Sequence, residues 1–195
     1  GGVSTRRTSY NLIAARKPKG ANTGQTVLVT ARHDSPPASP GANEGASGAA
    51  VLLETARLLA SQQVDTEVRF VSLGAAYDGA RGADAYVRSL SEAEKQQIVA
   101  AFCLNGVGSA DAGELTAVTA DGLRNLPADL AEQAGAVFSA ARPGEAGIGG
   151  EATVFARAGI PAAVLVAPVP ADRKRELSQD TVDRISREQL SRTAQ

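Results

Sequence analysis

The chain has 195 residues, 43% of them hydrophobic, and 20 Lys and Arg against 21 Asp and Glu leave a formal net charge of -1. This length can bury one complete core, and so small a charge excludes a global field that would draw the protein to nucleic acid or anionic lipid. No apolar run approaches about 18 residues, so we expect no direct membrane insertion by this segment. The only cysteine, Cys103, excludes an intramolecular disulfide, which fits a reducing compartment and equally a secreted bacterial domain.

The first third of the chain predicts a hairpin followed by a helix. Tyr10–Arg16 is typical of a strand, and the turn-rich segment 17–24 indicates that it returns as a hairpin, pairing antiparallel with Thr26–Ala31. A polar loop follows, and then apolar residues recur at helical spacing. We expect this helix to begin at Ser47 or Gly45.

Strands and helices alternate along the rest of the chain. The predicted strands are 67–73, 99–108, 115–120, 136–142 and 161–167, and the predicted helices are 83–90, one opening at Ser91, 126–135, 150–158 and one opening at Ser186. Both serines start capping boxes, with Glu94 and Gln189 at the third helical positions. The alternation predicts an α/β protein, a three-layer α/β/α sandwich with a central mixed, mostly parallel sheet.

Domain organisation is predicted to be simple, because no linker-like tract divides the sequence. We expect one domain over residues 1–195, with 1–7 as a flexible N-terminus or residues left from cloning. Active sites in such folds lie beyond the carboxyl ends of central strands. The polar residues there are Arg32–Asp34, the segment 76–78 and Asn105.

Six segments of the chain share motifs with one enzyme family. They are, in order, NLIA, VLVTARHDS, PGANEGASGAAVLLE, VRFVSLGAAYDGARGADAYV, FARAGIPAAVL and SQDTVDRIS. Together they resemble the M28-type zinc aminopeptidases, a family that also contains glutaminyl cyclases and members without catalytic activity. The resemblance runs from Tyr10 to Thr193 and implies a zinc-aminopeptidase-like fold.

The chemistry of that family is missing from the matching positions. The resemblance implies peptide-bond hydrolysis by two metal ions, held by imidazoles and carboxylates beside a glutamate base. The positions of those ligands and that base are here Arg32, Glu44, Ala76, Tyr77, Asn105 and Glu176, and none keeps the family residue. Independently of any family, one histidine cannot supply two imidazole ligands. We therefore expect no cofactor and no catalytic residues in a vestigial cleft formed by Arg32, His33, Asp34, Glu44, Ala76, Tyr77, Asp78, Asn105 and Glu176.

Arg32 is the substitution with the clearest physical meaning. A guanidinium has no lone pair for a metal, and its fixed charge repels one. If the fold brings Arg32 near Glu44 and Glu176, as the resemblance implies, its charge can replace that of the metal. We predict an Arg32-centred polar network; the alternative is that Arg32 points into solvent.

These observations predict a catalytically inactive pseudopeptidase domain with a binding, scaffolding or regulatory role. Its expected partner is a protein, a peptide or a cell-envelope component, and an extracytoplasmic location is expected because relatives are often exported. One alternative is a metal-dependent aminopeptidase with a rearranged one-metal site of His33, Asp34, Glu44 and Asp78, which needs a strand register shifted by one residue. Another is a small-molecule or anion binder that uses the same cleft.

Overall fold

The computed structural model describes residues 8–141, 150–171 and 176–194. Its described residues form a mixed seven-stranded sheet in the order β1-β3-β2-β4-β7-β5-β6. The strands are β1 (Leu12–Arg16), β2 (Thr26–Arg32), β3 (Glu67–Leu73), β4 (Ile98–Leu104), β5 (Thr116–Thr119), β6 (Val137–Ser139) and β7 (Ala162–Val166). β3, β2, β4 and β7 run parallel, whereas β1 and β5 run antiparallel to their neighbours β3 and β7. The expectation for residues 1–7 lies outside the described residues.

The predicted hairpin of the first two strands is wrong. β1 pairs antiparallel with β3, and β3 lies between β1 and β2. Turn residues in segment 17–24 reverse the chain as expected, but they leave room for a third strand between the two that they connect. Local turn signals do not encode which partner a strand finds later in the sequence.

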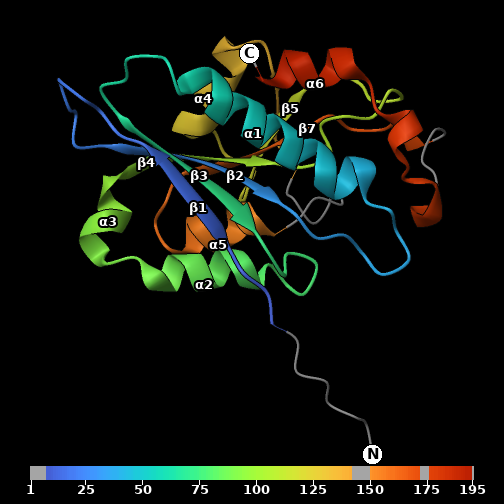
Figure 1. The fold of residues 1–195 in the computed structure, drawn as a ribbon, viewed down its shortest axis with the longest axis horizontal. Coiled ribbons are helices and arrows are strands. Elements are labelled where there is room, and N and C mark those ends of the chain that lie inside the picture. The colour runs from blue at the N-terminus through green and yellow to red at the C-terminus, as the bar shows by residue number, and fades with distance from the viewer. Residues whose placement is uncertain (1–7, 142–149, 172–175, 195) are drawn as a thin grey trace, which may run out of the picture.

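Helices cover both faces of the sheet, so the predicted three-layer α/β/α sandwich is confirmed. In Figure 1, α2 (Arg81–Ser89) and α5 (Glu151–Arg157) lie below the sheet, and α1 (Gly48–Leu59) and α6 (Arg187–Ala194) lie above it. The remaining α-helices of the described residues are α3 (Glu92–Gln97) and α4 (Leu126–Gln133). Short 3-10 helices, η3 (Leu177–Gln179) and η4 (Val182–Arg184), precede α6.

A separate apolar core fills the space on each side of the sheet. One core lies between the sheet and the helices α2 and α5 and contains Phe155, Leu28 and Val71. The other lies between the sheet and α1 and contains Val51 and Phe70. Since successive side chains of a strand point to opposite faces, the nearly continuous apolar sequences of β2 and β4 supply both cores. Leu190 of α6 packs against the α1 core.

The start of α1 differs in detail from the prediction. One turn of π-helix, η1 (Ala42–Ser47), precedes α1, which begins at Gly48. A Cβ atom at Gly48 would lie 2.6 Å from the backbone oxygen of Leu104, so only glycine lets α1 approach β4 this closely. This contact brings the loop before α1 to the carboxyl end of the sheet.

Both predicted capping serines begin helices. At α3, the Ser91 hydroxyl accepts the Glu94 backbone N–H, and the Glu94 carboxylate accepts the Ser91 backbone N–H, which completes the box. At α6, the Ser186 hydroxyl accepts the Gln189 backbone N–H.

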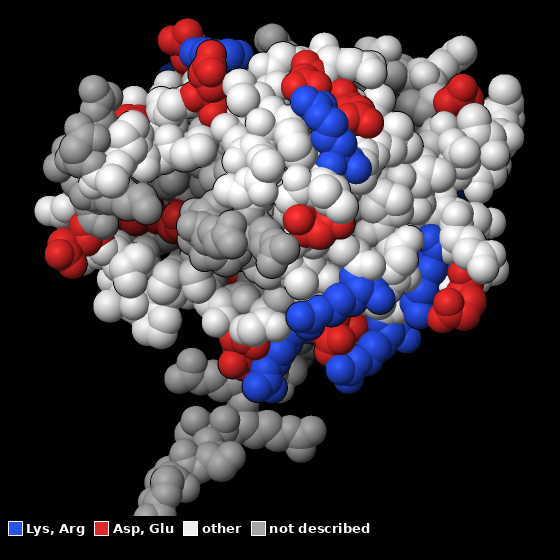
Figure 2. Space-filling model, turned by 180° about the vertical axis from the view of Figure 1, so that it is seen from behind, with Lys and Arg blue, Asp and Glu red and all other residues white. Residues whose placement is uncertain are grey.

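The surface carries charges of both signs. Figure 2 shows Lys and Arg side chains gathered along one edge of the face seen from behind, with acidic side chains among them. Exposed helices carry ion pairs such as Arg88 with Asp84 and Lys95 with Glu92. Among the described residues, no helix combines the length and apolarity that a membrane crossing requires.

Candidate functional site

The candidate site lies where β2, β3 and β4 end. Arg32 is the last residue of β2 and lies opposite Leu73, the last residue of β3, and the loop 105–108 follows β4. Because Arg32 lies four positions after Leu28 in the same strand, its side chain points to the same side of the sheet, toward α5. The strand alternation therefore buries the arginine, and the alternative in which it points into solvent is wrong: Arg32 is only 5% exposed.

The ion-pair partner of Arg32 is a carboxylate that sequence reasoning missed. Arg32 Nε lies 3.4 Å from Oε1 of Glu151, the first residue of α5, and both side chains are almost fully buried. The predicted partners were Glu44 and Glu176. Of these, Glu176 is exposed and precedes η3, and no ion pair between described residues includes it.

Tyr77 connects Arg32 to Glu44. The Arg32 guanidinium carbon lies 4.7 Å from the centre of the Tyr77 ring, and the Tyr77 hydroxyl donates a hydrogen bond of 2.9 Å to Glu44 Oε2. Partial burial, and then the Glu44 carboxylate, raise the pKa of the Tyr77 phenol above its usual range. The phenol therefore stays protonated and can donate. An Arg32-centred network exists, and Glu44 belongs to it through an aromatic ring.

Asp34 is attached to the same tyrosine. Its Oδ2 atom accepts the Tyr77 backbone N–H at 3.2 Å, and its backbone oxygen would lie 2.5 Å from a Cβ atom at Gly45. Asp34 thus contacts both the loop after β3 and η1. Buried Asn105 donates its backbone N–H to Leu165 and lies next to Gly106, whose Cβ would lie 3.9 Å from Glu44 Oε1.

Glu44 itself is positioned by Asp180, a second residue that the sequence reasoning did not single out. The two carboxylate oxygens of Asp180 accept the backbone N–H groups of Asn43, at 2.6 Å, and of Glu44, at 3.1 Å. A carboxylate at this place satisfies free backbone donors at the start of η1. Asp180 belongs to the SQDTVDRIS segment, so the motif was the available signal.

The structure does not bring all nine predicted cleft residues together. Arg32, Asp34, Glu44 and Tyr77 form one contact network. His33 is exposed and its Nδ1 lies 2.8 Å from Ser72 Oγ, whereas Asp78 pairs with Arg81 at 3.0 Å. Ala76 contributes no functional group.

The donor set does not fit the zinc pair that the fold implies. The first ligand position holds the cationic Arg32, and the phenol of Tyr77 and the methyl group of Ala76 occupy two further positions. His33, the only histidine, is bonded to Ser72. Among the described residues, no group of three or more His, Cys, Asp or Glu side chains has the arrangement of a metal site.

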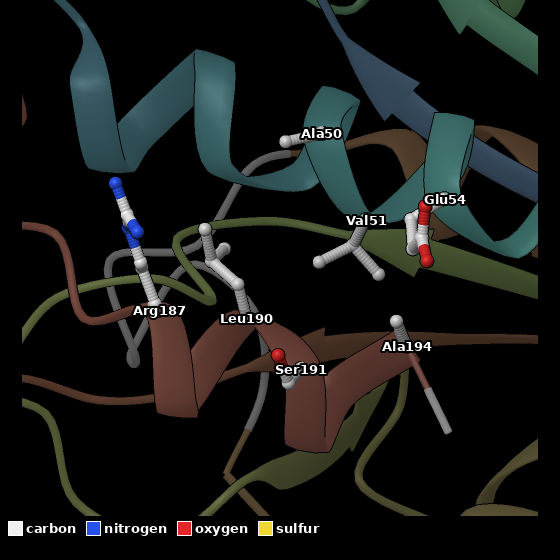
Figure 3. Close-up of a pocket in the computed structure, with 7 residues that line it drawn as sticks. All are labelled: Ala50, Val51, Glu54, Arg187, Leu190, Ser191 and Ala194. Carbon is white, nitrogen blue, oxygen red and sulfur yellow. The ribbon is translucent and has the colours of Figure 1, made fainter.

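One pocket among the described residues lies apart from this polar network. A pocket of about 310 Å³ separates α1 from α6, with Val51 and Leu190 on its walls and Glu54 and Arg187 at different ends (Figure 3). None of its lining residues belongs to the candidate site. Cys103 is also buried, and its burial raises the pKa of the thiol to about 12, which excludes a reactive thiolate at neutral pH.

Comparisons with known proteins show the family to which the chain is similar. The model of Peptidase family M28 matches residues 11–195. Aminopeptidase YwaD of Bacillus subtilis (strain 168) is 44% identical over 123 residues, which are 62% of this chain and 27% of that protein. An aminopeptidase of Pseudomonas aeruginosa (strain UCBPP-PA14) is 35% identical over 111 residues, which are 57% of this chain and 20% of that one.

Solved structures show the same fold. The zinc aminopeptidase BSAP from Bacillus subtilis superposes with a TM-score of 0.82 at 33% identity, over 94% of this chain and 47% of that chain. The aminopeptidase from Aneurinibacillus sp. strain AM-1 superposes with a TM-score of 0.81 at 34% identity, over 94% and 45% of the two chains. This chain therefore spans less than half the length of these relatives.

Proposed function

Because this chain belongs to peptidase family M28, we propose that it is a catalytically inactive member, a pseudopeptidase domain whose cleft binds rather than hydrolyses. The observation that carries the proposal is the buried Arg32. At the position that the resemblance gives to the first metal ligand stands a guanidinium, which cannot coordinate a metal. This guanidinium pairs with Glu151, and the Tyr77 ring packs against it. In this proposal the Arg32 guanidinium supplies the positive charge that metal ions would supply at that position.

Two further positions support loss of catalysis. Ala76 stands where the resemblance places the glutamate base, and an alanine methyl cannot accept a proton from water. Glu44, at the position of the bridging ligand, accepts the Tyr77 hydroxyl. In this proposal Ala76 removes the base, and the hydrogen bond from Tyr77 occupies the Glu44 carboxylate.

The proposed role is binding, scaffolding or regulation. We infer a protein, peptide or cell-envelope partner outside the cytoplasm, in keeping with the sequence-based expectation. On the face seen in Figure 2, basic side chains lie among acidic ones, a mixture that does not favour nucleic acid there.

A direct test is an aminopeptidase assay on L-leucine p-nitroanilide with and without added zinc, using Bacillus subtilis aminopeptidase as the positive control. We expect no turnover above the blank. The Arg32→His variant should also remain inactive, because Ala76, Tyr77 and Asn105 are unchanged. Zinc-dependent turnover by the unchanged chain would overturn the proposal in favour of the rearranged one-metal site around His33.

A further inference from the structure

Two buried polar atoms in the candidate site have no hydrogen-bond partner among the described residues. They are Nη2 of Arg32 and Oδ1 of Asp34. A buried polar atom that is left unpaired has lost its hydrogen bonds to water without replacement, so native structures rarely keep one without a reason. Both residues touch Tyr77: the ring lies against Arg32, and the backbone N–H is bonded to Asp34. The two unpaired atoms are thus associated with one tyrosine.

Tyr77 lies against the buried Arg32 and is itself partly exposed to solvent. It is 36% exposed, and the one side-chain hydrogen bond found for it in the described structure goes to Glu44. Its loop contains two alanines with left-handed backbones, Ala75 with φ 49° and Ala80 with φ 56°. Such conformations cost non-glycine residues free energy and are retained most often where they serve a function.

The unpaired atoms and the surrounding charges define the chemistry of a ligand. Arg32 Nη2 requires an acceptor, and Asp34 Oδ1 requires a donor. Arg32, Asp34, Glu44 and Glu151 together carry one positive and three negative formal charges, so a simple anion is repelled. A ligand that satisfies both atoms therefore carries a carboxylate for the arginine and an ammonium group for the carboxylates.

We propose that this site binds a free α-amino acid as a zwitterion, with its carboxylate on Arg32 Nη2, its ammonium group on Asp34 Oδ1, and Tyr77 closing over it. The inference rests on the proposed function, because it assigns Arg32 and Asp34 to a ligand in a cleft without metal. Charge-assisted hydrogen bonds are about twice as strong as neutral ones. A peptide N-terminus offers Arg32 only a neutral carbonyl oxygen, so the free amino acid is the better match.

Isothermal titration calorimetry on EDTA-treated protein tests this inference with glycine, L-alanine and L-leucine as probes. L-Alaninamide lacks the carboxylate and N-acetyl-L-alanine lacks the ammonium group, so they are the matched control compounds. We expect at least one amino acid to bind saturably, and its amide and N-acetyl derivatives to bind at least tenfold more weakly. A thermal scan with saturating ligand should show the corresponding rise in Tm.

Variants assign the contacts. Arg32→Lys keeps the charge but removes Nη2, and Asp34→Asn keeps the shape but removes the negative charge. Each should weaken binding at least tenfold, while Arg57→Lys, in an exposed ion pair with Glu54, should leave it unchanged. Circular dichroism establishes that each variant is folded, and Asp34→Asn tests the site even if Arg32→Lys does not fold.

The inference is overturned if none of the amino acids binds, if either derivative binds as tightly as its parent, or if a folded Asp34→Asn variant binds normally. Failure of this inference is separable from failure of the proposed function. Absent amino-acid binding together with absent zinc-dependent turnover refutes the ligand alone. Zinc-dependent turnover refutes the pseudopeptidase as well.

Discussion

Replacing Arg32 with methionine should remove a large fraction of the protein's free energy of unfolding. The variant keeps a long apolar side chain but leaves the Glu151 carboxylate buried without its cation, since the two side chains are 5% and 6% exposed. Breaking a buried ion pair in this way costs about 3–5 kcal/mol. Loss of the cation–π contact with Tyr77 adds about 1 kcal/mol. A typical domain has only about 5–15 kcal/mol in total.

Urea unfolding followed by far-ultraviolet circular dichroism measures this cost. Glu151→Gln alone should also destabilise the protein, because it leaves the arginine unpaired. The double variant Arg32→Met/Glu151→Gln should lose clearly less free energy than the sum of the two single variants, since neither partner is then left charged. As a matched control, Arg57→Met removes an exposed ion pair and should change stability little. A cost below about 1 kcal/mol for Arg32→Met, or strict additivity in the double variant, would refute the buried pair.

Three further predictions concern the fold around the site. Burial raises the pKa of the Cys103 thiol to about 12, against about 8.5 in an unfolded chain, so its contribution to stability is complete below pH ~8.5 and is lost as the pH rises toward 12. In urea unfolding at pH 7, 9 and 10, the free energy of unfolding should therefore fall less steeply with pH for Cys103→Ala than for the unchanged protein. Equal declines in the two proteins would contradict this. Ser91→Ala removes the cap of α3 and should lower the free energy of unfolding in urea by about 1 kcal/mol, whereas Ser91→Gly should lower it by only a few tenths of a kcal/mol. If Ser91→Ala were no more destabilising than Ser91→Gly, the cap would not contribute to stability. Gly48→Ala should lower Tm although alanine favours helices, because the added methyl meets the Leu104 carbonyl at 2.6 Å; a raised Tm would mean that α1 does not approach β4 so closely.

The sequence predicts the architecture well because its signals are local. Alternation and apolar runs indicate β3 and β7, and the serine and glutamate at positions 91 and 94 mark the start of α3. The same local signals fail for β1, since the choice between β2 and β3 as its partner depends on packing across a long stretch of chain. The family motifs name the strand ends that meet at the site, but not the contacts that form there.

At the candidate site, the sequence indicates which residues matter but not which side chains contact each other. Arg32 stands out in the sequence because a cation at a position that the resemblance gives to a metal ligand argues against metal binding. Its partner was missed because Glu151 lies 119 positions away, at the start of a short predicted helix whose other residues draw attention to apolar packing. One signal in the sequence was available: Glu151 is the only acidic residue of the segment that forms α5, and Ala152 and Phe155 of that segment are buried. Burial of such a carboxylate requires a cation, and Arg32 was the candidate nearest the predicted site.

The zinc content of the purified chain tests the central claim most directly. After incubation with excess zinc and desalting, inductively coupled plasma mass spectrometry should find far less than one zinc ion per chain, while Bacillus subtilis aminopeptidase treated in parallel retains its metal. The account predicts this result for the unchanged protein because Arg32, paired with Glu151 and stacked on Tyr77, holds the first ligand position. One or more zinc ions retained per chain would contradict it.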